Sequence, residues 1–154
     1  MINSAIENPF MLMAIEKAIE SYKIGEVPVG AVLVNNQGEV IDASKNSVFL
    51  NNDPTAHAEI LAIRNGSKRL KSSRLDSCDL YVTLEPCPMC FHAISLARIR
   101  RVYFGAYDTD KYKKENLLNA KSNKRNYYYP EVISGLNEKI CSDLLKNFFQ
   151  KLRV

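Results

Sequence analysis

The chain has 154 residues, of which 46% are hydrophobic and 25% are charged, and its formal net charge at pH 7 is +4. These values are typical of a globular domain that can bury a core without disulfide bonds. No apolar run of 18 residues and no basic-then-apolar N-terminal segment is present, which argues against a membrane span and a secretion signal, so we expect one domain, residues 1–154, in the cytoplasm.

The N-terminal part of the chain predicts a helix followed by a β-hairpin. The asparagine–proline pair at residues 8–9 suits the cap and the first position of a helix, and apolar residues then recur at helical spacing from Pro9 to Tyr22. Residues 30–34 form a short run rich in β-branched side chains, which is typical of a strand. After a turn, residues 40–46 return as the second strand of the hairpin.

A second helix is predicted for residues 56–68, after a loop rich in capping residues. His57 and Glu59 then lie in its first turn. Residues two apart on an ideal helix point in nearly opposite directions, so both side chains can face one site only from the end of the helix.

A strand at residues 80–83 leads into a third helix, predicted for residues 87–97. Cys87 and Cys90 lie in its first turn, at the i, i+3 spacing that puts two side chains on one face. The exposed amides of a helix N-terminus also favour the thiolate form, which is the form that binds metal.

The C-terminal third predicts a strand at residues 102–105, a polar and basic segment with a short helix around Leu117, a strand at residues 131–133 and an amphipathic helix at residues 137–153. The order of elements predicts a three-layer α/β/α sandwich with a mixed five-stranded sheet. We expect the first hairpin to be antiparallel and the strands of β-α-β steps to be parallel neighbours.

His57, Cys87 and Cys90 together provide three ligands for zinc. A structural zinc site closes all four positions with protein atoms, whereas a catalytic site keeps the fourth for water, whose pKa falls to about 7. Glu59, beside the metal and outside the ligand set, would carry protons between that water and a substrate. A His-x-Glu pair followed by Pro-Cys-x-x-Cys is the signature of zinc deaminases that act on nucleobases.

A closed structural zinc site is the alternative, and it needs a fourth ligand. His92 lies two residues after Cys90, which turns it away from the face of the two cysteines. Cys78 is a remote candidate. Otherwise Cys78 and Cys141 are predicted to be small buried residues.

Basic residues are concentrated in two stretches. Residues 98–128 contain nine basic and three acidic residues, a local net charge of +6, and residues 60–75 contain five basic residues and no acid. Such stretches suit a polyanionic partner. A merely solvated surface explains the charge equally well.

At these motifs the chain resembles the cytidine deaminase superfamily, and within it most closely the bacterial tRNA adenosine deaminases. The resemblance implies conversion of adenosine to inosine at the wobble position of tRNA(Arg) with an ACG anticodon. It also implies a homodimer that binds the anticodon stem-loop, one zinc ion in each subunit, and no DNA or membrane partner. The residues that carry it are 26–34, Asn46, 53–59, 80–90, Arg98-Ile99, 104–106 with Asp108, and Phe148-Phe149.

The resemblance also assigns roles to individual residues. It implies that His57, Cys87 and Cys90 are the zinc ligands and that Glu59 is the catalytic proton shuttle. The substrate contacts that it implies are Asn46, the Ala58 amide, Pro86 and Asp108.

The chain departs from the family pattern in residues 107–129, which in the family form part of the RNA-facing surface. The tyrosines at residues 127–129 could stack on bases or pack on the last strand and the final helix. Two other functions stay open: a guanine deaminase, which shares the metal motifs, and an RNA-binding protein with a non-catalytic zinc. The features that favour tRNA are residues 27–30, Thr83-Leu84, the basic stretch and Phe148-Phe149.

Overall fold

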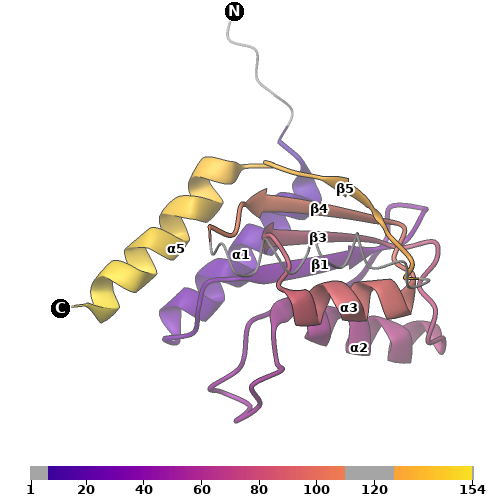
Figure 1. Cartoon of the computed structure of the whole chain (residues 1–154), viewed down its shortest axis with the longest axis horizontal. Helices are drawn as coiled ribbons and strands as arrows, with labels where there is room; N and C mark the ends of the chain where they lie inside the picture. The colour runs from indigo at the N-terminus through magenta and orange to yellow at the C-terminus, as the bar shows by residue number, and fades with distance from the viewer. Residues whose placement is uncertain (1–6, 110–126, 154) are drawn as a thin grey trace, which may run out of the picture.

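The computed structural model describes residues 7–109 and 127–153, and a mixed five-stranded sheet lies at its centre (Figure 1). The strand order is β2-β1-β3-β4-β5. The described elements are α1 (Pro9–Lys23), β1 (Gly30–Val34), β2 (Val40–Lys45), α2 (Ala58–Leu70), β3 (Asp79–Leu84), α3 (Pro88–Ala97), β4 (Arg101–Ala106), β5 (Glu131–Ile133) and α5 (Glu138–Leu152).

The sheet confirms the predicted antiparallel hairpin, but one expected pair of parallel neighbours, β2 and β3, is not adjacent. β1 is antiparallel to both β2 and β3, whereas β4 is parallel to both β3 and β5. The β-α-β step through α3 therefore joins parallel neighbours, as expected. The step through α2 does not, because β1 lies between β2 and β3. All five residues of β1 are buried, which suits a central strand, while β2 mixes buried and half-buried residues, which suits an edge.

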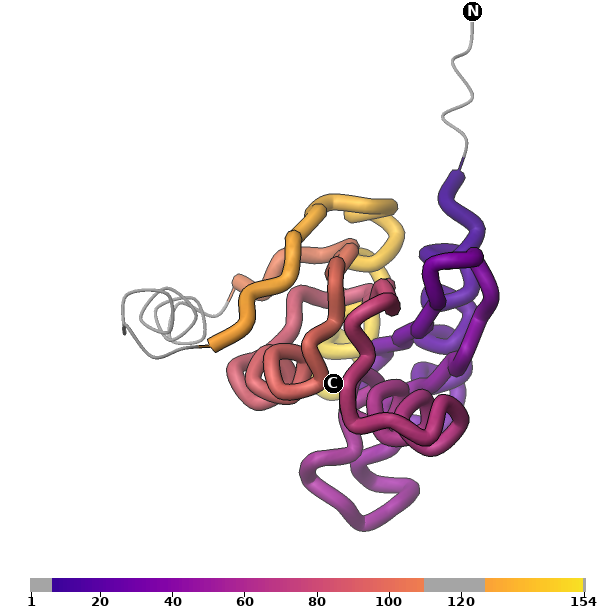
Figure 2. The backbone as a smooth tube through the Cα atoms, turned by 90° about the vertical axis from the view of Figure 1, so that its right-hand side faces the viewer, coloured from indigo at the N-terminus to yellow at the C-terminus, as the bar shows by residue number. Residues whose placement is uncertain are grey.

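Helices cover both faces of the sheet, so the predicted three-layer sandwich is confirmed (Figures 1 and 2). α1 and α5 pack on one face, where one core cluster contains Met11 and Cys141. α2 and α3 pack side by side on the other face, where a second cluster contains Ala62, Cys78 and Ile94. Both cysteines outside the metal motif are thus small buried residues, as predicted.

α1 packs so closely on the sheet that Gly30 has no room for a side chain. A Cβ atom built on Gly30 would lie 1.9 Å from the carbonyl oxygen of Ala14. The start of α1 follows the predicted pattern, because Oδ1 of Asn8 accepts hydrogen bonds from the amides of Phe10 and Met11 at 2.9 and 3.1 Å.

Two helices begin slightly later than their sequence patterns predict. α2 begins at Ala58 and α3 at Pro88, because His57 and Cys87 are extended cap residues. The short helix predicted around Leu117 lies outside the described residues. Within the described part of the chain, no helix is long and apolar enough to cross a membrane.

Candidate active site

The N-terminal ends of α2 and α3 bring His57, Cys87 and Cys90 together. Nδ1 of His57 lies 3.6 Å from Sγ of Cys87 and 3.4 Å from Sγ of Cys90. Tetrahedral coordination with ordinary zinc–nitrogen and zinc–sulfur bonds places such atoms about 3.6 Å apart. One nitrogen and two sulfur atoms, all within 4.8 Å of one another, therefore fit a zinc ion.

Local backbone geometry frees these side chains for the metal. His57 and Cys87 are the N-cap residues of α2 and α3, both have extended dihedral angles, and neither side chain caps its own helix. Because the helices pack side by side with their N-termini at the same end of the molecule, the two caps converge (Figure 1). The prediction that His57 and Glu59 share a site only from the end of a helix agrees with this arrangement.

The described residues offer no fourth protein ligand in the metal-binding cluster. His92 is exposed on α3, with its ring against Tyr127 at 5.1 Å between centroids. Cys78 is buried in the core beneath α2 and α3. The arrangement is that of an open catalytic site rather than a closed structural one.

The two thiols share a hydrogen bond that separates their acidities. The pKa of Cys87 is lowered to about 4, chiefly because the Cys90 thiol donates a hydrogen bond to it. The same hydrogen bond, together with burial, raises the pKa of Cys90. The opposite shifts favour the thiolate form at Cys87, which is the form that binds metal.

Glu59 lies beside the three ligands without belonging to their set. It is the second residue of α2 and is only 4% exposed. Burial raises its pKa, opposed by a hydrogen bond with Cys90. A buried carboxyl group at this place can hold or release a proton next to the metal-binding cluster.

The cluster opens into a cavity of about 740 Å³, which His57, Glu59 and Cys87 help to line. This volume is in the usual range for small-molecule sites, which is about 300 to 1,000 Å³. The sequence-predicted contacts Asn46, Ala58 and Asp108 also line it. Pro86 is buried and Cys90 is buried, and neither is a lining residue.

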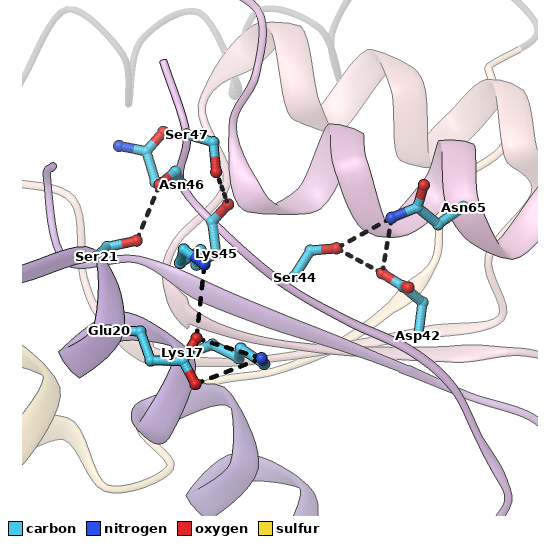
Figure 3. Close-up of polar contacts among 9 residues, drawn as sticks. All are labelled: Lys17, Glu20, Ser21, Asp42, Ser44, Lys45, Asn46, Ser47 and Asn65. Carbon is cyan, nitrogen blue, oxygen red and sulfur yellow. Dashed lines mark hydrogen bonds and ion pairs between the residues drawn. The ribbon is translucent and has the colours of Figure 1, made fainter. Parts of the chain in front are cut away.

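Asn46 is held as a wall of this cavity by contacts with α1 and with the segment between α1 and β1. Its Nδ2 donates to the carbonyl of Val27 at 3.2 Å. Its backbone carbonyl accepts from the Ser21 hydroxyl at 2.9 Å (Figure 3). Its Oδ1 atom is buried and has no hydrogen-bond partner within the described residues. A buried acceptor of this kind is satisfied at low cost by a donor on a bound molecule.

Asp108 is held by a neighbouring acid. The backbone amide of Asp108 donates to Oε1 of Glu85 at 3.0 Å, and the Glu85 amide donates to the carbonyl of Ala106 at 2.8 Å. These bonds fix the chain where it leaves β4, so the Asp108 side chain starts from a defined position at the cavity.

The sequence patterns assigned no role to several other lining residues. Glu26 is almost fully buried, and Phe49 lies in the loop between β2 and α2. One side of the cavity comes from α5 and its end, through Ser142, Leu145, Lys146, Phe149, Gln150 and Arg153. Glu26 carried a usable signal, since it is a single acid between a helix end and an apolar strand.

Folding neutralises part of the positive charge that the sequence showed. Arg100 makes two hydrogen bonds to Asp79, both of 2.9 Å, and Arg101 pairs with Glu131 at 2.9 Å.

Arg98 lies over the ring of Tyr128, 5.8 Å from its centroid. The tyrosines contact α3 here: the ring of Tyr129 lies 5.8 Å from that of Phe91 on α3.

Residues 5–106 match the family described as "Cytidine and deoxycytidylate deaminase zinc-binding region". A tRNA-specific adenosine deaminase of Haemophilus influenzae is 41% identical over 99% of this chain and 88% of its own length. A solved structure from a study of A-to-I editing by tRNA:A34 deaminases has a TM-score of 0.82 and 46% identity, over 88% of this chain and 98% of its own. A guanine deaminase of Bacillus subtilis has a TM-score of 0.64 and 35% identity, over 94% and 91%.

Proposed function

The chain belongs to the cytidine and deoxycytidylate deaminase family, and from this premise we propose that it converts adenosine to inosine in a tRNA anticodon. The observation that carries the proposal is a buried glutamate beside a histidine and two cysteines at the bottom of a cavity. The two relatives that are described as tRNA deaminases are 41% and 46% identical to this chain. The guanine deaminase is 35% identical. The enzyme is a zinc-dependent hydrolytic deaminase.

His57, Cys87 and Cys90 are the residues that would hold the zinc ion. Bound zinc supplies a water molecule acidic enough to react at neutral pH. Three protein ligands would leave a fourth coordination position open for that water. The predicted alternative is an RNA-binding protein with a non-catalytic zinc. A non-catalytic site does not need a buried carboxyl group outside the ligand set, so Glu59 argues against this alternative.

Glu59 is proposed to move the protons of the reaction. Its carboxylate takes a proton from the attacking water and delivers it to the ring nitrogen next to the reacting carbon. The oxygen forms a bond to C6 of adenine, the bond from C6 to the amino nitrogen breaks, and a second proton from the water leaves with the departing ammonia. The products are inosine and ammonia, so no oxidant or other reactant is needed.

Four further residues are proposed to hold the substrate. Asn46 has the buried Oδ1 acceptor described above, and the Ala58 amide, at the first position of α2, has no partner inside the helix. Asp108 starts from the backbone position that Glu85 fixes and is proposed to contact a ribose. Pro86 lies directly before Cys87 and is proposed to shape the wall behind the metal-binding cluster.

The finer assignments are also proposals. We expect the target to be tRNA(Arg) with an ACG anticodon, recognised as an anticodon stem-loop, and the enzyme to be a cytoplasmic homodimer with one deaminase domain. The shared sheet of the described residues supports the single domain, and the family resemblance supports the rest. Light scattering tests the dimer: a mass of twice the chain mass of 17.5 kDa is expected.

One experiment separates the candidate substrates. The zinc-loaded protein is incubated separately with an ACG anticodon stem-loop, with guanine and with cytidine, and released ammonia and inosine are measured. We expect ammonia and inosine from the RNA alone. Ammonia from guanine and none from the RNA would establish the guanine deaminase instead, and RNA binding without ammonia from any substrate would establish the non-catalytic protein.

A further inference from the structure

A large aromatic side chain stands exposed at the mouth of the cavity and has no part in the chemistry above. Phe49 is 70% exposed, yet it lines the same cavity as His57 and Glu59. It belongs to the loop between β2 and α2, which projects from the body of the molecule at the lower edge of both views (Figures 1 and 2). A ring that is both exposed and part of the cavity lining is accessible to a molecule that enters the cavity.

The loop that carries Phe49 is fixed by a buried acid. Glu26 is 1% exposed, and its Oε1 accepts a hydrogen bond of 2.7 Å from the backbone amide of Leu50. Within the loop, the amide of Asn51 donates to the carbonyl of Ser47, and that of Asp53 to the carbonyl of Val48, both at 3.0 Å. Burying a carboxyl group is unfavourable, so its bond to an exposed loop indicates that the position of the loop matters.

Two cations line the same cavity as Phe49. Lys146 and Arg153 line the cavity from α5 and its end, and both are exposed. An aromatic ring and two cations that line one cavity suit a ligand with aromatic bases and phosphates. A single strand of RNA has both, and its bases are free to stack.

We propose that Phe49 is a stacking platform for the unpaired base next to the edited adenosine, and that Glu26 is the positioning residue that holds this platform. The edited base itself must reach the buried Glu59 at the bottom of the cavity. A ring at the mouth is therefore left for a neighbouring base. The inference rests on the proposed function, because it requires an RNA substrate.

Initial rates with the zinc-loaded full chain and the anticodon stem-loop test the platform. Phe49→Ala is expected to raise KM roughly tenfold with little change in kcat, because base–aromatic stacking is lost and the chemistry is not. Phe49→Tyr keeps a ring and should stay near the wild-type KM. The matched control is Leu50→Ala: Leu50 is 62% exposed in the same loop but does not line the cavity, and its backbone amide is retained.

An RNA that lacks one base decides whether stacking is the cause. The base on the 5′ side or the 3′ side of the adenosine is replaced by an abasic nucleotide. For one of these two RNAs, KM of the wild-type protein should rise about as much as in Phe49→Ala, and Phe49→Ala should add no further rise. A tenfold effect of Phe49→Ala that persists on both abasic RNAs would overturn the platform, as would an unchanged KM on the intact RNA or an equal effect of Leu50→Ala.

Glu26 is tested through its dependence on Phe49. Glu26→Gln keeps an oxygen that can accept from Leu50 and should keep KM, whereas Glu26→Ala should raise KM about as much as Phe49→Ala. The double variant should be no worse than either single one, since a positioning residue acts through the ring that it places. Independent effects that multiply would overturn this role of Glu26. A wild-type protein that neither binds nor deaminates the stem-loop would overturn the proposed function, and the platform with it.

Discussion

The bottom and the mouth of the cavity are built in different ways. At the bottom, His57, Glu59, Cys87 and Cys90 are placed by two helix N-termini, and most of their surface is buried. At the mouth, Phe49 and the end of α5 present exposed side chains from elements far apart in the chain. From this difference we expect that catalysis and the proposed binding of RNA can be changed separately. Variants at the bottom should alter kcat, and variants at the mouth should alter KM.

Removing the metal should give the largest effect. A zinc chelator, or Cys90→Ala, which removes a proposed zinc ligand, is expected to reduce deamination to the background rate. Metal analysis and activity of the same samples check this, and added zinc should restore the chelated wild-type protein but not the variant. Full activity in a metal-free sample would contradict the assignment of the bottom of the cavity.

Glu59→Gln should have the next largest effect on deamination. The amide keeps the shape of the side chain but cannot transfer the proton, so kcat is expected to fall about 10³-fold, in the usual range of general acid–base catalysis. Zinc content and thermal stability should stay close to the wild type, because Glu59 is outside the ligand set. Inosine formation is measured at saturating RNA; retained activity would refute the proton-shuttle mechanism.

Lys146→Ala and Arg153→Ala should act at the mouth and have smaller effects. If each cation pairs with a phosphate, KM rises severalfold at low salt, and the slope of log affinity against log salt becomes shallower by about 0.7 for each cation–phosphate pair removed on single-stranded RNA. Lys139→Ala, an exposed lysine at the start of α5 that does not line the cavity, is the control. A salt slope identical to wild type in both variants would show that these cations do not meet phosphates.

The smallest effect, on stability, is expected from the hydrogen bonds of Asp53. This residue lies near the end of the loop that carries Phe49, shortly before α2 begins. Oδ1 of Asp53 accepts from the hydroxyl and the amide of Thr55 at 2.7 and 2.9 Å. These bonds hold the pKa of Asp53 below its ordinary value of 3.8, and the bond from the Thr55 hydroxyl contributes most. Arg64 makes a smaller contribution in the same direction. A depressed folded-state pKa stabilises the protein above 3.8, and this stabilisation disappears as the pH falls through the lower, folded-state value.

Thr55→Ala tests the sign of this effect. The variant should melt slightly below the wild type at neutral pH, and the difference in Tm should shrink as the pH falls below 3.8. Thermal melts at several pH values measure it. A difference that grows in acid would mean that Asp53 is not stabilised as its carboxylate.

Local patterns predicted most of the elements, but the strand order needed the whole chain. Asn8 and Pro9 signalled the start of α1, and the apolar run of β1 signalled a strand, because capping and side-chain alternation act within a few residues. The position of β1 between β2 and β3 could not be predicted in this way. It depends on α1 and α2, which pack on opposite faces of β1 and bury it.

The site divides in the same way. The spacing of His57 and Glu59, and of Cys87 and Cys90, predicted two helix N-termini that carry metal ligands and one carboxyl group outside the ligand set. Such a pattern is local, because a cap residue and the first turn of its helix lie within a few positions of each other. Only the tertiary structure decided that Glu26 holds the loop of Phe49 and that α5 lines one side of the cavity. Those contacts join residues far apart in the chain, and long-range packing, rather than local conformational preference, brings them together.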